Sequence, residues 1–192
     1  MSCSQVLNGI TLGCETSVGG IKEVYIAKYA DVEQPTVSEI DDTKGLITEI
    51  TMIPLKDADG EPIKDEDGNI KTAKFEPYQF RKQTGSMTST LNVDETAGIN
   101  YVSTEVSLVF TKMETKKRIE MSALAMQQLV VIVKDGNNKY WYLGYDDYVS
   151  AVAGSGNSGT AKGDSNNYSI TLKDESDTFP FEVSEEAVLA VL

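Results

Sequence analysis

The residues whose spacing comes nearest to a known ligand site lie in the acidic segment 57–69, DADGEPIKDEDGN. Within and after it, Asp65, Asp67, Asn69 and Glu76 occupy positions 1, 3, 5 and 12 of a calcium loop of the EF-hand type. That loop needs glycine at position 6, where this chain has Ile70, and no helical pattern flanks the segment. The Asp-Gly pairs at 59–60 and 67–68 are typical of tight turns. The segment therefore predicts a turn-rich hairpin arm over residues 55–74 rather than a calcium site. The carboxylates of this arm that we expect to make contacts are Asp57, Asp59, Glu61, Asp65 and Asp67.

Patterns typical of catalysis are missing from the chain. It has no histidine, which excludes Ser-His-Asp and Cys-His relays, histidine-ligated zinc and imidazole acid–base chemistry. The glycine-rich segment 154–163 lacks the G-x-x-x-x-G-K-[ST] spacing of a phosphate-binding loop. The paired carboxylates Asp146–Asp147 and Glu185–Glu186 are direct neighbours, and neighbours in a strand point to opposite faces. We therefore expect no enzymatic activity, no cofactor and no bound metal.

The charge of the chain is strongly acidic and unevenly distributed. Seventeen Lys and Arg stand against 30 Asp and Glu, a formal net charge of −13, and the only arginines are Arg81 and Arg118. Residues 31–68 carry 3 basic and 12 acidic side chains, whereas residues 69–139 carry 10 basic and 7 acidic ones. This pattern fits either complementary contacts between subunits or an ordinary solvated surface. So acidic a chain is not expected to hold a phosphate backbone tightly.

Nothing near the N-terminus has the pattern of a secretory signal, because the first basic residue is Lys22 and no continuous apolar run precedes it. The longest apolar runs are far shorter than the roughly 20 residues that span a bilayer. We therefore expect synthesis in the cytoplasm and no membrane partner. Cys3 and Cys14 are then expected to remain free thiols.

Most of the chain alternates between apolar and polar residues, the period of half-buried antiparallel strands. Strands are predicted at 21–29, 46–55, 86–94 and 101–110. The last two are joined by a hairpin-length loop that contains Gly98. Their apolar side chains share one face, and the opposite face is polar. The polar face comprises Ser86, Thr88, Thr90, Asn92, Ser103, Glu105 and Ser107.

One helix is predicted, at about residues 112–127. Thr111 and Glu114 have the spacing of a capping box, and Ile119, Ala123 and Met126 recur with helical periodicity. A buried strand at 129–134 and a partner at 139–144 follow, joined by a turn. Trp141 lies in that partner, where we expect it to pack in the core; a ligand-stacking platform is the alternative.

The C-terminal part predicts a strand at 146–153, a mobile loop at 154–167 that is rich in Gly, Ser and Asn, a strand at 168–173 and an edge piece at 179–181. The aliphatic residues of 188–192 either dock on their own core or cover a neighbouring subunit. Together the elements predict a single domain over residues 1–192. Its fold is mainly β, an antiparallel β-sandwich or barrel-like structure with one flanking α-helix and the arm.

Several stretches together resemble the tail tube proteins of phages, especially those of phages of gut Bacteroidales. NGI at 8–10 with Leu12 and Cys14, and GGIKEVYI at 19–26, resemble the opening of that family. GSMTSTL at 85–91 and NYVSTEVSL at 100–108 resemble its central strand pair, and KMETKKRIEM at 112–121 resembles its helix. The resemblance covers about residues 3–183. It implies a tail-tube fold and a virion structural subunit assembled in the bacterial cytoplasm.

In such a tail, subunits form hexameric rings that stack into a tube and meet other tail proteins, and DNA passes through the lumen without tight binding. We expect strands 86–94 and 101–110 to form the ring sheet, because a neighbour's strand can close an open sheet edge. Their polar face suits a wet lumen wall, although an ordinary solvated face explains it equally well. The arm is expected to contact the adjacent ring or a surrounding layer.

Two other functions remain open at this stage. The first is a tube protein of a contractile injection system related to type six secretion, which resembles a tail tube. The second is a β-sandwich glycan-binding module whose stacking platform would comprise Tyr140, Trp141, Tyr142 and Tyr145.

Overall fold

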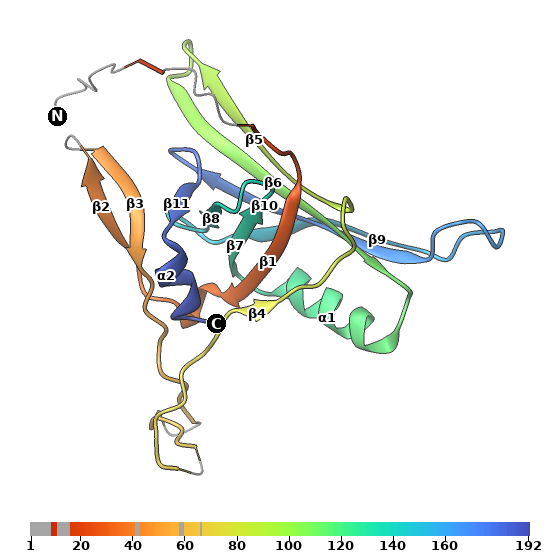
Figure 1. The fold of residues 1–192 in the computed structure, drawn as a ribbon, viewed down its shortest axis with the longest axis horizontal. Helices are drawn as coiled ribbons and strands as arrows, with labels where there is room; N and C mark the ends of the chain where they lie inside the picture. The colour runs from red at the N-terminus through yellow and green to blue at the C-terminus, as the bar shows by residue number, and fades with distance from the viewer. Residues whose placement is uncertain (1–8, 11–15, 41–42, 58–59, 66) are drawn as a thin grey trace.

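Strands dominate the computed structural model, which describes residues 9–10, 16–40, 43–57, 60–65 and 67–192. In this part of the chain they form two sheets, as Figure 1 shows. The large sheet has the order β2-β3-β11-β8-β7-β1-β4, and the small sheet has the order β5-β6-β10-β9. The strands are β1 Ile21–Lys28, β2 Thr36–Ile40, β3 Thr43–Glu49, β4 Glu76–Pro77, β5 Gly85–Asp94, β6 Ile99–Thr111, β7 Leu129–Asp135, β8 Tyr140–Leu143, β9 Ser150–Asn157, β10 Asn167–Ser176 and β11 Phe181–Val183. The helices are α1 Thr115–Met126 and α2 Glu185–Leu189, and a 3₁₀ turn covers Tyr29–Asp31.

The two sheets pack face to face and share a hydrophobic core, which confirms the predicted β-sandwich with one long helix. Val24 and Ile26 of β1 and Val131 of β7 meet Val106 and Leu108 of β6 in this core, and all five side chains are buried. The alternation along β6 is the cause, because every second side chain turns toward the large sheet.

The large sheet is buried on both faces. Ala27, Val130 and Ile132 lie in a second core on the face away from the small sheet. Helix α2 covers this face, with Ala187 and Val188 buried and the Ser184 hydroxyl accepting a hydrogen bond from the Ala187 N–H. Burial on both faces explains the unbroken apolar run of β7. The C-terminal aliphatics therefore mostly dock on their own core, although Leu189 stays 63% exposed.

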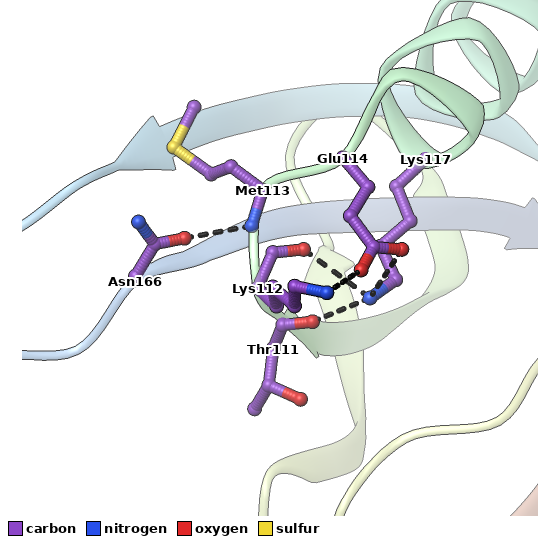
Figure 2. A network of polar contacts seen from close by, with 6 residues as sticks. All are labelled: Thr111, Lys112, Met113, Glu114, Lys117 and Asn166. Atoms are coloured by element: carbon purple, nitrogen blue, oxygen red, sulfur yellow. Dashed lines mark hydrogen bonds and ion pairs between the residues drawn. The ribbon is translucent and has the colours of Figure 1, made fainter.

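Helix α1 begins later than the sequence predicted, and the predicted capping box is wrong. Glu114 is the N-cap and its side chain caps no backbone N–H. Lys112 has a φ of 67°, which turns the chain between β6 and α1. Figure 2 shows what holds this turn: Lys117 Nζ donates to the Thr111 carbonyl at 2.5 Å, and Asn166 Oδ1 accepts from the Met113 N–H at 2.7 Å. The carboxylate of Glu114 is therefore paired with Lys112 and Lys117 instead of the backbone.

Four predicted elements need correction. The strand predicted at 146–153 begins only at Ser150. The predicted mobile loop 154–167 is wrong over 154–157, because β9 runs to Asn157 and pairs with β10. The predicted edge piece at 179–181 is wrong in position, since β11 lies between β3 and β8 inside the large sheet. The strand predicted at 46–55 ends at Glu49, where the chain leaves the large sheet toward the arm.

The arm, residues 55–74, projects away from both sheets (Figure 1). Its described residues contain the turns predicted around Gly60 and Gly68, both with a φ of 86°. The backbone closes on itself in a ring that the sequence analysis did not predict: Leu55 N–H donates to the Lys71 carbonyl, Lys71 N–H to that of Ile63, and Ile63 N–H to that of Leu55, each at 2.8 Å. The three residues of this hydrogen-bonded ring lie eight positions apart in the sequence. The segment LKDADGEP at 55–62 is followed by the similar segment IKDEDGNI at 63–70. The arm is thus two copies of one turn unit rather than a single hairpin.

No helix among the described residues is long and apolar enough to cross a membrane.

Candidate functional site

The seven predicted ring-sheet residues lie together on one face of the small sheet. Cross-strand pairs join Ser86 to Ser107, Thr88 to Glu105 and Thr90 to Ser103, and residues paired in this way point to the same side. Asn92 pairs with Tyr101 on the same face. We call this the polar face. It is turned away from the core, because the alternate residues Val102, Val106 and Leu108 are the buried ones.

Strands β10 and β9 continue the polar face with small hydroxyl side chains. Ser107 and Thr171 hydroxyls lie 3.2 Å apart, and those of Ser155 and Ser169 lie 2.8 Å apart. The charges on this part are few: Lys173 forms an ion pair with Glu175 at 2.7 Å, and the hydrogen bond to that carboxylate raises the pKa of Lys173. The two arginines of the chain, Arg81 and Arg118, both lie outside this sheet. The polar face therefore offers hydrogen-bonding groups without a cluster of cations.

Both edges of the small sheet are long and open in the described structure. β5 has ten residues and β9 has eight, and each pairs on one side only. Natural edge strands are usually blunted by charge, proline or shortness. β4, an edge of the large sheet, follows this rule, with two residues that end in Pro77. In contrast, β9 has neither charge nor proline, and β5 is uncharged from Gly85 to Val93.

Large apolar side chains lie exposed on these same edges. Leu91 and Val93 of β5 are 50% and 60% exposed, and Val152 of β9 is 51% exposed. A backbone edge without charge and with apolar side chains beside it can add a further strand. Adding a strand is the strongest chemical capability of the site. The sequence predicted only the first half of the β9 edge, because the Gly and Ser content of 154–157 had predicted a loop.

Two of the five predicted contact residues of the arm, Asp57 and Asp65, hold the arm's own turns. Asp65 Oδ1 accepts from the N–H groups of Asp67 and Asn69, at 3.0 and 2.8 Å. These bonds, with the Asn69 N–H first, lower the pKa of Asp65. Asp57 acts in the same way toward the Glu61 N–H at 3.0 Å. Asp59 lies outside the described residues. Within the described residues, no group of three or more cysteine, aspartate and glutamate side chains is arranged to hold a metal ion.

The aromatic residues of the alternative glycan platform do not share a surface. Tyr140 and Tyr142 are buried in the second core, at 4% and 2% exposure. Trp141 alternates to the other side of β8, where its indole N–H donates to Asp135 at 3.1 Å. It belongs to neither core, so the predicted core role is wrong as well. Tyr145 packs edge to face on Phe181, with ring centroids 4.7 Å apart.

One buried carboxylate that the sequence analysis missed lies at the end of β10. Asp174 is 2% exposed and accepts a hydrogen bond from the Gly144 N–H at 3.1 Å. Burial, together with the nearby carboxylates of Asp146, Asp147 and Glu175, raises the pKa of Asp174 to about 6. Its alternation with Ile170 and Leu172 on the inner face was the available signal.

No family model, curated protein or solved structure matches this chain.

The raised pKa of Asp174 predicts a pH-dependent stability. Unfolding returns this carboxyl to a pKa near 3.9, so its contribution to stability is complete at acid pH and is lost as the pH rises through 6. Asp174→Asn stays neutral and keeps the acceptor for Gly144. We take the difference in free energy of unfolding between this variant and the unmodified chain. From pH 4.5 to pH 7.5 this difference should shift by roughly 2 kcal/mol in favour of the variant. Urea titrations at the two pH values measure this. The exposed Asp67→Asn, in the arm, is the matched control because Asp67 is not among the carboxylates that raise the pKa of Asp174. An unchanged difference at both pH values would contradict the assignment.

Proposed function

We propose that this chain is a structural subunit of a tube. Copies join through the β5 and β9 edges of the small sheet into a closed ring, and rings stack into a hollow conduit. The observation that carries the proposal is the pair of long, uncharged, open edges on opposite sides of one sheet. The resemblance of the sequence to phage tail tube proteins then assigns six copies per ring, a place in the virion tail, and DNA as the cargo.

The directions of the strands support the addition of identical copies, each in the same orientation. Neighbouring strands in the described small sheet are all antiparallel, so its two edge strands run in opposite directions. When β5 of one copy lies beside β9 of the next, the pair is therefore antiparallel as well, and the alternation continues without a break. Such head-to-tail addition produces a ring if the rotation between copies closes. Pairing would also cover part of Leu91, Val93 and Val152.

The layer arrangement supports placing the polar face toward the lumen. The large sheet and α2 lie behind the inner face of the small sheet (Figure 1). In a ring of sheets the outside offers more room than the inside, so the thick side of each copy faces out. The thin, uncovered side, which carries Thr88, Thr90 and Ser103, then lines the channel.

The chemistry of that lining suits passage of a polyanion. Each phosphate that a cation neutralises adds salt-dependent affinity, which would slow transit. The charged residues of the polar face are Glu105, Asp94 at the end of β5 and the Lys173–Glu175 pair, and most of the other residues are neutral. The same geometry would serve the tube of a contractile injection system; the sequence resemblance favours the phage tail. The arm, which leaves the body of the subunit with its charged turns, is proposed to contact the adjacent ring or an outer layer.

Crosslinking between the two edges tests the ring. We expect a chain carrying Thr88→Cys on β5 and Ser155→Cys on β9, in a background with Cys3→Ser and Cys14→Ser, to give a ladder of covalent oligomers that ends at a closed hexamer. The linker should be shorter than roughly 14 Å, because three strand spacings alone place these positions at least that far apart in one copy. Denaturing gels and mass spectrometry provide the measurement.

The single-cysteine variants are the matched controls, because a copy with one thiol can form no covalent species beyond a dimer. A double variant that also stops at dimers, at concentrations where the protein is assembled, would overturn the proposed β5–β9 contact.

Lysine substitutions on the polar face test whether this face lines the conduit. We expect assembled unmodified protein to show no salt-dependent binding of duplex DNA. Thr88→Lys with Thr90→Lys should create binding whose log Kd changes linearly with log salt concentration, because the lining then neutralises phosphates. Thr36→Lys with Gln79→Lys, outside the polar face, adds the same charge without that effect. Fluorescence anisotropy across a salt series measures this, and equal DNA binding by both variants would contradict a polar-face lumen.

A further inference from the structure

The small sheet carries opposite charge at the two ends of its strands. One end, which we call the basic end, lies where β6 leads into α1 and where the chain enters β5. It comprises Arg81, Lys82, Lys112, Lys116, Lys117 and Arg118. The carboxylates at this end are Glu114, Glu120 and Asp164, and the loop that holds Asp164 also carries Lys162. Glu114 is paired with Lys112 and Lys117, and Glu120 accepts the Tyr78 hydroxyl. Arg81, Lys116 and Arg118 take part in no ion pair with the described residues, so an excess of positive charge remains.

The backbone fixes the basic end at one end of the strands. Thr84 donates its N–H to the Arg81 carbonyl and its hydroxyl to the Val109 carbonyl, which places the turn 81–84 beside the last residues of β6. Helix α1 follows from Thr111 after the turn at Lys112, shown in Figure 2. Both arginines of the chain are therefore at this end, within a protein whose net charge is −13.

The acidic end lies at the opposite end of the same strands. It comprises Asp94, Glu95, Asp146, Asp147, Glu175 and Asp177. Asp94 and Glu95 are at the β5–β6 turn, and Glu175 pairs across the strands with Ser103 near the start of β6. The loop after β8 joins them there, since the Asp177 N–H donates to Asp146 Oδ2 at 3.2 Å. Lys173 of β10 is paired with Glu175 of this end.

The two ends cannot neutralise each other within one copy. Strand β6 has 13 residues and spans roughly 40 Å. The Debye length at physiological ionic strength is about 8 Å, so salt screens the ends from one another. Two copies that meet end to end would instead bring opposite charges within a few ångströms. Contact between like ends would be repulsive, which gives the contact a direction.

We infer that successive rings contact each other through these ends, the basic end of one copy lying against the acidic end of a copy in the next ring. This inference rests on the proposed function. If the sheet edges close the ring, the hydrogen-bonding direction runs around it, and the strands, although tilted, run toward the neighbouring rings. The charge pattern then sets the polarity of the stack, and it acts separately from the backbone pairing that closes each ring.

Charge reversal at the two ends tests the inference. Lys116→Glu with Arg118→Glu reverses part of the basic end. The fold should tolerate it, because acidic residues near a helix N-terminus are favourable. Glu95→Lys with Asp147→Lys reverses part of the acidic end. We work at about 0.05 M salt, where surface charges are weakly screened. Each variant alone should then form at least tenfold fewer stacked rings than the unmodified chain, as measured by sedimentation velocity and electron microscopy. Mixing the two variants should restore mixed pairs of rings, because their reversed ends are complementary.

The readouts separate this inference from the proposed function. The edge-to-edge crosslinking ladder should be unchanged in every variant, because ring closure uses backbone groups. Glu33→Lys, away from both ends, should stack like the unmodified chain. Variants that stack as well as the unmodified chain would overturn the inference while leaving the ring intact. Absence of the crosslinking ladder from the unmodified chain would overturn the proposed ring and this inference with it.

Discussion

The unpaired backbone groups along β5 and β9 are the constraint on which the rest of the structure depends. A strand edge in water keeps its N–H and C=O groups solvated, but an uncharged edge of this length is a template for another strand. The large sheet presents less of such an edge, because β4 is short and ends in proline and the five-residue β2 has two register shifts, whereas the eight-residue β9 has one. The exposure is confined to the sheet whose outer face is polar. A subunit that assembles through these edges uses a feature that a monomer would have to suppress.

The remaining layers support the small sheet and leave its polar face and both edges exposed. The shared core holds β6 and β10 against the large sheet, and the large sheet is supported in turn by α2 on its far side. Burial on both faces makes the large sheet a rigid support, and this leaves the polar face and both edges of the small sheet free for contact. Helix α1 also leaves most of its surface exposed. Its Leu124 is buried in the shared core, Met121 packs against that core, and polar contacts hold its N-terminal turn.

Much of the strand pattern could be predicted from the sequence, because alternation reports which face a residue takes. The polar face is the clearest case, since Ser86, Thr88 and Thr90 were assigned to one side from period alone and their register with β6 confirms it. The predictions that were wrong concern residues whose structure depends on tertiary context. The segment 154–157 has the composition of a loop, yet it is a strand because β10 supplies a ladder of partners. Thr111 and Glu114 have capping-box spacing, but Lys112 adopts a positive φ and Glu114 finds lysines instead. The repeat in the arm was visible in the sequence at a spacing of eight residues, whereas the closing of its backbone ring was not.

Hydrogen exchange at the amides of the two edge strands tests the central claim most directly. In dilute protein, the outward-facing amides of Gly85–Asp94 and Ser150–Asn157 should exchange far faster than those of the central strand β6. On concentration into assemblies, both edges should gain protection together, at alternate residues, while β2 at the edge of the large sheet keeps its exchange rate. Assemblies in which β5 and β9 exchange as fast as in dilute protein would contradict the account, because their backbone groups would then have found no partner.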